Sequence, residues 1–437
     1  MFVSSTWKNK LAKMPAWFIS VYAAICSFAV YFCMYAFRKP FTAAGFSDLS
    51  FLKIDYKVWL VSAQLVGYML SKFYGIRFIA GMQLHKRANT IVVLIIIAWA
   101  TLFLFALTPA PYNIIFLLLN GFPLGMIWGL VFSYLEGRKA TEFMGAVLSV
   151  SFIFSSGVVK TVGKGLMLNN HVSELWMPFY TASIFLIPLF LFTWLLNHIP
   201  APTDKDIHLR CIRKPMTKPE RKNFIHFFLP GLIVIITTYV LLTILRDFRD
   251  NFSNELYNEL GYGNNPDIFT VTETPVALIV LASVSMLVFI KNNVRAFLLN
   301  HVIIIIGYII ALVATILFIY KIIDPVWWMI FIGSGLYMSY VPFNALYFER
   351  MIATYKVQSN VGFLMYISDA FGYLGSVLIL FLKGFSGVQL SWTDFFIRAV
   401  FTVTIIGITG TSIAAIYFHR KHKTLFGLPS NFKIHAA

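Results

Sequence analysis

The stretch FLLNHVIIIIGYIIALVATILFIY (297–320) decides the fold class, because it is long, continuously apolar and free of Asp, Glu, Lys and Arg. A helix needs about 20 such residues to cross the hydrocarbon core of a bilayer. The run IVVLIIIAWATLFLFAL (91–107) has the same character. Strands of a transmembrane β-barrel alternate apolar and polar residues, so continuous runs exclude that architecture. These stretches predict a helical membrane protein.

The composition extends this prediction to the whole chain. Of 437 residues, 59% are hydrophobic and 12% charged, and the mean hydropathy is +0.77. Soluble domains carry about twice that share of charged residues, so the composition excludes a chain of soluble domains. Three cysteines and nine unclustered histidines provide neither a disulfide framework nor a metal site, and we expect no cofactor.

Twelve candidate spans follow one another along the sequence, and one long, basic, Pro-rich linker interrupts them at 198–223. The linker separates an N-terminal half (1–197) from a C-terminal half (224–437), each with six spans. The first apolar run is too long for a signal peptide, and we interpret it as a span. The expected spans are 16–44, 57–82, 89–108, 112–135, 143–167, 176–197, 224–249, 269–290, 296–320, 325–348, 357–382 and 396–418. This layout resembles the major facilitator superfamily and predicts an all-α polytopic protein with two pseudo-symmetric six-helix bundles.

Basic residues are distributed unevenly between the predicted loops. Most of the 35 Lys and Arg residues lie on the side that holds both termini and the linker 198–223. Few lie clearly on the other side: Lys53, Lys57, Lys321 and Lys383. The positive-inside bias therefore predicts cytoplasmic termini in a multi-pass protein of the cell inner membrane. The same bias accounts for the net charge of +17 without a nucleic-acid partner. We expect membrane lipids around a monomer.

A short repeat relates the two halves. Tyr31 precedes Arg38 by seven residues in the first span, and Tyr239 precedes Arg246 by the same interval in the seventh. On a continuous helix this interval places both side chains on one face. The repeat predicts one arginine from each half at similar depth. An interfacial anchor for Arg38, and neutralisation of Arg246 by Asp247 or Asp250, are the alternatives.

Other ionisable residues fall inside predicted spans, where they are costly and usually mark a pathway or an ion pair. Lys72 lies near the middle of its span, far from either interface. Lys160 and Lys164 are four residues apart on one face of span five. Asp369 is either a coupling group or the partner of a buried cation, and Glu273 is expected near a pore mouth. A cavity with several cations and few anions in a low dielectric attracts an anion.

Several motifs in order along the chain resemble one branch of this superfamily, the organophosphate:phosphate antiporters. They are YAFRKPF (35–41), GYMLSKF (67–73), NGFPLGMIWG (120–129) and FGYLGS (371–376). The resemblance implies that Arg38 and Arg246 bind the substrate phosphate with help from Lys72, and that Ser155 occupies the place of the family's substrate-site histidine. GMQLHKR (81–87) departs from the acidic loop of the family, as do Asp369 and the charged run 246–250.

Together the residues and the resemblance predict a secondary transporter for a small anionic, phosphorylated solute, with exchange for phosphate as one mode. A proton-coupled carboxylate transporter is the main alternative, and Asp369 is the residue that would support it. A transporter-like sugar-phosphate sensor would need a larger cytoplasmic surface than the linker offers. A membrane enzyme would need a catalytic cluster of Ser, His, Asp or metal ligands, and none is found in the sequence.

Overall fold

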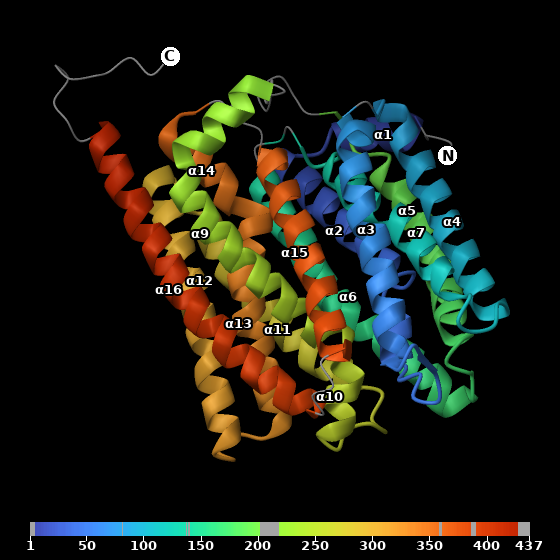
Figure 1. Cartoon of the computed structure of the whole chain (residues 1–437). Helices are drawn as coiled ribbons and strands as arrows, with labels where there is room; N and C mark the ends of the chain where they lie inside the picture. Colours follow the sequence, from blue (N-terminus) through green and yellow to red (C-terminus); the bar gives the residue numbers. More distant parts are fainter. Residues whose placement is uncertain are drawn as a thin grey trace.

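The computed structural model describes residues 5–80, 82–136, 138, 140–201, 218–357, 361–385 and 390–426. Twelve long helices run through these residues (Figure 1). They are α2 (Ala16–Tyr35), α3 (Tyr56–Ala80), α4 (Arg87–Leu107), α5 (Ile114–Phe132), α6 (Thr141–Asn170), α7 (Met177–Leu196), α9 (Lys218–Asn251), α11 (Ile268–Val288), α12 (Asn293–Ile319), α13 (Pro325–Pro342), α15 (Val361–Phe385) and α16 (Trp392–Phe426). Nine of the helices in the described residues are long and apolar enough to cross a membrane by length and composition alone.

Short elements connect the long helices. They are α1 (Ser5–Ala12), η1 (Pro40–Ala43), η2 (Leu84–Lys86), α10 (Ser253–Glu259), η3 (Phe343–Tyr347), α14 (Phe348–Tyr355) and an antiparallel hairpin of β1 (Ser50–Phe51) and β2 (Ile54–Asp55). In Figure 1, α1 and the last turns of α16 lie at one end of the bundle and α10 lies at the other. We refer to these as the termini end and the α10 end.

Two of the predicted boundaries need correction. The first span was expected over 16–44, but α2 ends at Tyr35, and Pro40, which lacks a backbone N–H, starts the separate turn η1. The expected linker 198–223 overlaps α9, which begins at Lys218. The remainder of that linker, 202–217, lies outside the described residues.

The helices form two sets, α2–α7 and α9–α16, and each set packs mainly within itself. Between the sets, α6 packs against α11 and α3 packs against α15. These are the fifth and second long helices of one set against the second and fifth of the other. A two-fold rotation that exchanges the two sets would turn one of these contacts into the other, so the pairing fits two-fold pseudo-symmetry.

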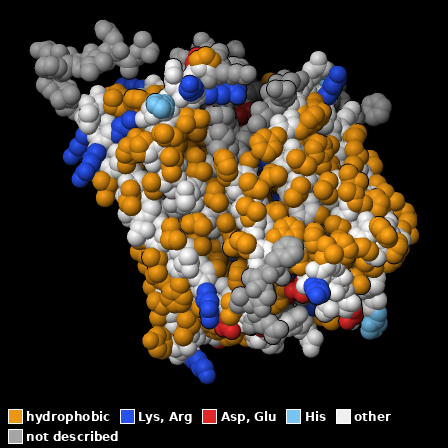
Figure 2. All heavy atoms as spheres, in the orientation of Figure 1, with side chains coloured by type: hydrophobic (Ala, Val, Ile, Leu, Met, Phe, Trp, Pro, Cys, Tyr) orange, Lys and Arg blue, Asp and Glu red, His pale blue; other side chains and the backbone are white. Residues whose placement is uncertain are grey.

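Helix α4 illustrates how its sequence fits a membrane. Ile91, Ile95 and Ala98 recur at helical spacing and are buried, whereas the equally apolar Ile96 and Ile97 are exposed. An exposed apolar face of this length is suited to lipid. Figure 2 shows hydrophobic side chains across the middle of the visible face, with Lys and Arg mostly towards its two ends. The structure is that of a multi-pass membrane protein.

Close packing of α3 against α5 sets the position of the pocket wall. A Cβ atom on Gly67 would lie 2.0 Å from the Leu118 carbonyl oxygen, and one on Gly121 would lie 2.2 Å from that of Gln64. Only glycine permits this approach. The motif NGFPLGMIWG (120–129) therefore fixes the helix that carries Lys72.

Candidate functional site

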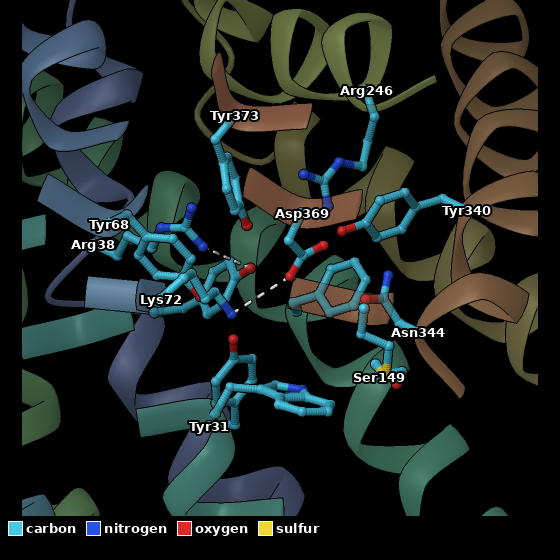
Figure 3. Close-up of a pocket in the computed structure, with 14 residues that line it drawn as sticks. Tyr31, Arg38, Tyr68, Lys72, Ser149, Arg246, Tyr340, Asn344, Asp369 and Tyr373 are labelled. Atoms are coloured by element: carbon cyan, nitrogen blue, oxygen red, sulfur yellow. Dashed lines mark hydrogen bonds and ion pairs between the residues drawn. The ribbon is translucent and has the colours of Figure 1, made fainter. Parts of the chain in front are cut away.

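A pocket lies between the two sets of helices and receives side chains from both (Figure 3). Of the lining residues that the structure describes, three are cations, one is a carboxylate and seven are aromatic. The lining residues are Tyr31, Tyr35, Arg38, Tyr68, Lys72, Trp128, Ser149, Phe152, Arg246, Tyr340, Asn344, Met365, Asp369 and Tyr373. Formal charges of the lining residues alone leave an excess of positive charge, which favours an anion.

Arg38 is buried in the pocket wall although it lies beyond the last residue of α2. Its Cζ atom is 4.0 Å from the centre of the Tyr68 ring, and its Nη1 atom is 3.5 Å from the Tyr35 hydroxyl. The Gln64 side-chain amide donates to the Arg38 carbonyl at 3.0 Å and holds the turn in place. Among the described residues, Arg38 has no carboxylate partner, and its Nε atom lacks a hydrogen bond.

Arg246 reaches the pocket from α9 and differs from Arg38 in its partners. Its Nη2 atom contacts Asp247 at 2.5 Å, and its Cζ atom lies 3.9 Å from the centre of the Tyr340 ring. Ser376 donates to the other oxygen of Asp247 at 2.9 Å. The Nε atom of Arg246 has no partner within the described part of the chain. Both arginines lie in the pocket, and the one on α9 is already partly neutralised.

The third cation, Lys72, faces Asp369 across the pocket, as the dashed line in Figure 3 marks. The Lys72 Nζ atom lies 3.6 Å from Asp369 Oδ2 and 5.1 Å from the centre of the Tyr68 ring. Tyr239 donates to Asp369 Oδ1 at 2.5 Å. Asp369 therefore connects a lysine of the first half with a tyrosine of the second.

The structure does not bring all of the predicted site residues into the pocket. Tyr31 lines the pocket. Tyr239 is not among the lining residues, but its hydroxyl donates to the lining residue Asp369. Ser155 is buried with its hydroxyl on the Ser151 carbonyl oxygen, and Ser149, on the same helix, lines the pocket instead. The expected pairing of Tyr31 with Arg38 on one helix face does not form, because α2 ends between them.

Lys160 lies outside the pocket, in a buried group that joins the two halves. Asp250 accepts from Lys160 at 2.7 Å with one oxygen and contacts Lys39 with the other. Ser156 donates to Asp250 at 2.5 Å. Lys39 also donates to the Asn251 side chain at 2.7 Å. Lys39, which directly precedes η1, and α6 are thereby tied to the end of α9.

A second buried pair crosses between the halves nearby. The Lys57 Nζ atom contacts both carboxylate oxygens of Glu255, each at 2.7 Å. Lys164 donates to the Asn254 side chain at 3.0 Å. Burial raises the pKa of Glu255, and the Lys57 ammonium offsets part of that rise. We call the five paired residues the inter-half cluster: Lys39, Lys57, Lys160, Asp250 and Glu255.

Glu273 is not at a mouth, because Arg249 Nη1 contacts it at 2.7 Å in the buried interior. Arg249 also donates to the Met329 carbonyl at 2.9 Å, which ties α9 to α13. The sequence left neutralisation of Arg246 by Asp247 or Asp250 as an alternative for the run 246–250, and Asp247 is the residue that contacts Arg246. On the helix the members of this run separate, since Arg246 faces the pocket while Arg249 and Asp250 face other neighbours.

Sequence reasoning missed Tyr68, Tyr340, Asn344 and Gln64. The signal for Tyr68 was present, because it precedes Lys72 by one helical turn. Tyr340 likewise precedes Asn344 by four residues. Gln64 is a buried amide in an apolar span, and such a group must find partners inside the protein.

A family model matches residues 40–421, and its description is a family of unknown function, DUF5690. The chain belongs to this family. No curated protein matches the chain.

Solved structures of three transporters resemble this fold over nearly the whole chain. A mutant of the nucleoside transporter NupG has a TM-score of 0.55 at 17% identity and covers 92% of this chain and 99% of its own. A D-xylose-proton symporter has a TM-score of 0.58 at 15% sequence identity, and the match covers 92% of this chain and 97% of the symporter. The POT family transporter PepTSo has a TM-score of 0.57 at 13% sequence identity, and the match covers 93% of this chain and 98% of PepTSo.

At these identities the likeness concerns the fold alone. It confirms the predicted fold class, an all-α polytopic membrane protein with the major facilitator architecture. The organophosphate:phosphate antiporter branch and the role of each site residue stay predictions.

Proposed function

We propose that this protein is a secondary active transporter that carries a small anionic organic solute, in particular a phosphorylated one, by alternating access. The observation that carries the proposal is the pocket between the halves, where Arg38, Lys72 and Arg246 meet one carboxylate, Asp369, among the described lining residues. Arginine offers planar bidentate hydrogen bonding to phosphate or carboxylate, and lysine adds a point charge. Exchange for inorganic phosphate is the mode that the resemblance in sequence favours.

The division of the pocket between the two halves supports a rocking mechanism. Arg38 and Lys72 come from the first half, and Arg246 and Asp369 come from the second. An anion bound by both arginines would contact both halves, so that movement of one half against the other would change its access. The inter-half cluster is buried near the start of α10, and this supports a state in which the pocket is closed towards the α10 end.

Asp369 gives a specific reason to keep a second candidate, a proton-coupled carboxylate transporter. Its carboxylate is the Lys72 partner and accepts from Tyr239. Protonation of Asp369 would remove one negative charge beside Lys72 and make the pocket more positive for the solute. In this variant the proton and the organic anion would move together.

Uptake into proteoliposomes tests the proposal. Purified protein should accumulate labelled inorganic phosphate when the vesicles are loaded with phosphate, and unlabelled organic phosphates should compete. Arg38→Ala should strongly reduce the uptake at low phosphate concentration. A pH gradient should drive uptake of labelled carboxylates only if the second candidate holds. Failure of phosphate and carboxylates to enter under either condition would reject an anion transporter.

The cellular setting belongs to the same proposal. We place the protein in the cell inner membrane as a monomer, with the termini end in the cytoplasm, because the basic loops predict that orientation. Labelling of single cysteines introduced at Asp267, near the α10 end, and at Trp7, on α1, tests it. External reagent should reach the first and not the second.

A further inference from the structure

We infer that the pocket contains a second, uncharged subsite, in which Asn344 with Ser149 binds a neutral hydrogen-bonding group of the solute. The inference rests on the proposed function and deepens it. The solute class is an organic anion with its charge at one end and hydroxyl or carbonyl groups at the other.

Aromatic contacts fix the level of this subsite relative to the arginines. The Phe152 ring meets the Tyr340 ring edge to face at 6.1 Å, and the Tyr340 ring also lies under the Arg246 guanidinium. Asn344 follows Tyr340 by four residues, and Ser149 precedes Phe152 by three. The helices run in opposite directions, so both residues are displaced towards the same end, by roughly 4.5–6 Å or about one turn.

The Asn344 side chain lies on an unusual piece of backbone. It belongs to η3, a single π-helical turn directly after Pro342, whose missing N–H interrupts the regular helical bonding. Such turns frequently occur at functional sites. Phe343 packs on the Tyr239 ring at 5.0 Å, and the Tyr347 hydroxyl lies 2.9 Å from His301 Nε2. The neighbours of Asn344 are therefore held in place while its amide faces the pocket (Figure 3).

The amide of Asn344 lacks a partner where one is expected. Its Nδ2 atom has almost no exposed surface and no hydrogen bond within the described part of the chain, although the residue as a whole is partly exposed. Buried donors are almost always paired, because an unpaired one is destabilising. A solute acceptor at this position would pair it. The lining residues at this level that come from α6 and η3 are uncharged, so the subsite does not favour a second anionic group.

The inference predicts selectivity between anions that differ only at their neutral end. Two matched pairs of probes separate the ends: methyl phosphate with glycerol 3-phosphate, and propionate with glycerate. Titration calorimetry of the purified protein should show tighter binding of the hydroxylated member in whichever pair binds. Asn344→Ala should remove that advantage, about tenfold, and leave methyl phosphate or propionate unchanged.

Two further variants keep the test decisive. Asn300 is a matched control, since it is a buried asparagine on α12 with an unpaired side-chain oxygen and does not line the pocket. Asn300→Ala should leave the selectivity intact, whereas Ser149→Ala should reduce it. Equal binding of both members to the unaltered protein, or an equal loss of both in Asn344→Ala, would overturn the subsite while the anion site stands. If neither pair binds, the proposed function itself fails, and the subsite fails with it.

Discussion

The central pocket and the inter-half cluster are both rich in buried cations, but they use them differently. In the inter-half cluster, Lys39, Lys57 and Lys160 each reach a carboxylate of the other half. In the pocket, the guanidinium of Arg38 rests on a tyrosine ring without a described carboxylate. Paired charges across an interface hold it closed, and an incompletely paired charge can attract a ligand. The difference assigns stability to one region and recognition to the other.

The largest expected effect breaks the inter-half cluster. Asp250→Asn leaves two buried ammonium groups, Lys39 and Lys160, without their shared carboxylate. Removing one partner of a buried ion pair costs about 3–5 kcal/mol. Thermal unfolding in detergent should show a large loss of stability. Asp267→Asn, at an exposed position near the start of α11, should leave the unfolding temperature unchanged. Equal stability of the two variants would show that the cluster does not hold the halves together.

The two arginines provide a sharper comparison within the pocket. Arg38→Ala should weaken phosphate binding by one to two decades, or about 1.5–3 kcal/mol, because it removes a charge-assisted contact. Arg246→Ala should weaken binding less and destabilise the protein more, since it leaves Asp247 without its cation. Calorimetry and thermal unfolding of both variants measure the two effects. If Arg246→Ala only destabilises, Arg246 is structural and a site with two arginines is wrong.

Much of this arrangement was predictable from sequence, and what was missed has physical causes. Continuous apolar runs are governed by the bilayer, so the long helices could be recognised from the sequence. Lys72 was identifiable because a charge at that depth requires a partner. The partners depend on tertiary packing. Nothing in the spacing of Lys160 indicates that it meets Asp250 in place of a solute, because Asp250 lies at the end of α9 in the other half of the sequence.

Tyr31 and Tyr239 show the limit of a repeat in sequence. Equal spacing suggested equal roles, yet α2 ends before Arg38 while α9 continues beyond Arg246. Pro40 follows Arg38 closely, and no proline stands at the corresponding place in α9. The two arginines therefore reach one pocket from different backbones, a turn and a helix.

Removal of the pocket carboxylate should have a moderate and opposite effect. Asp369→Asn releases Lys72 from its partner and leaves the pocket with one more unit of positive charge. Phosphate binding should strengthen about fivefold to tenfold, which corresponds to about 1 kcal/mol for one charge in a partly screened site. The matched control is Asp394→Asn, at an exposed position at the start of α16. Weaker binding in Asp369→Asn would show that Asp369 organises the site and does not compete with the solute.

The smallest expected effect separates the two pairs of the inter-half cluster by pH. Lys57→Met removes the ammonium that offsets the raised pKa of Glu255, so that pKa should rise further. Glu255 can then take up a proton, which limits the loss of stability at low pH. A raised pKa in the folded state means that the folded protein binds the proton more tightly than the unfolded chain. The stability of the variant should therefore be closest to that of the unaltered protein below the ordinary pKa of glutamate and should fall below it as the pH rises.

Thermal unfolding between pH 5 and 8 measures this difference in stability, and Lys57→Met/Glu255→Gln should remove its pH dependence. A difference that stays constant over this range would mean that Glu255 remains charged without Lys57, and that the pair contributes to closure through its other contacts.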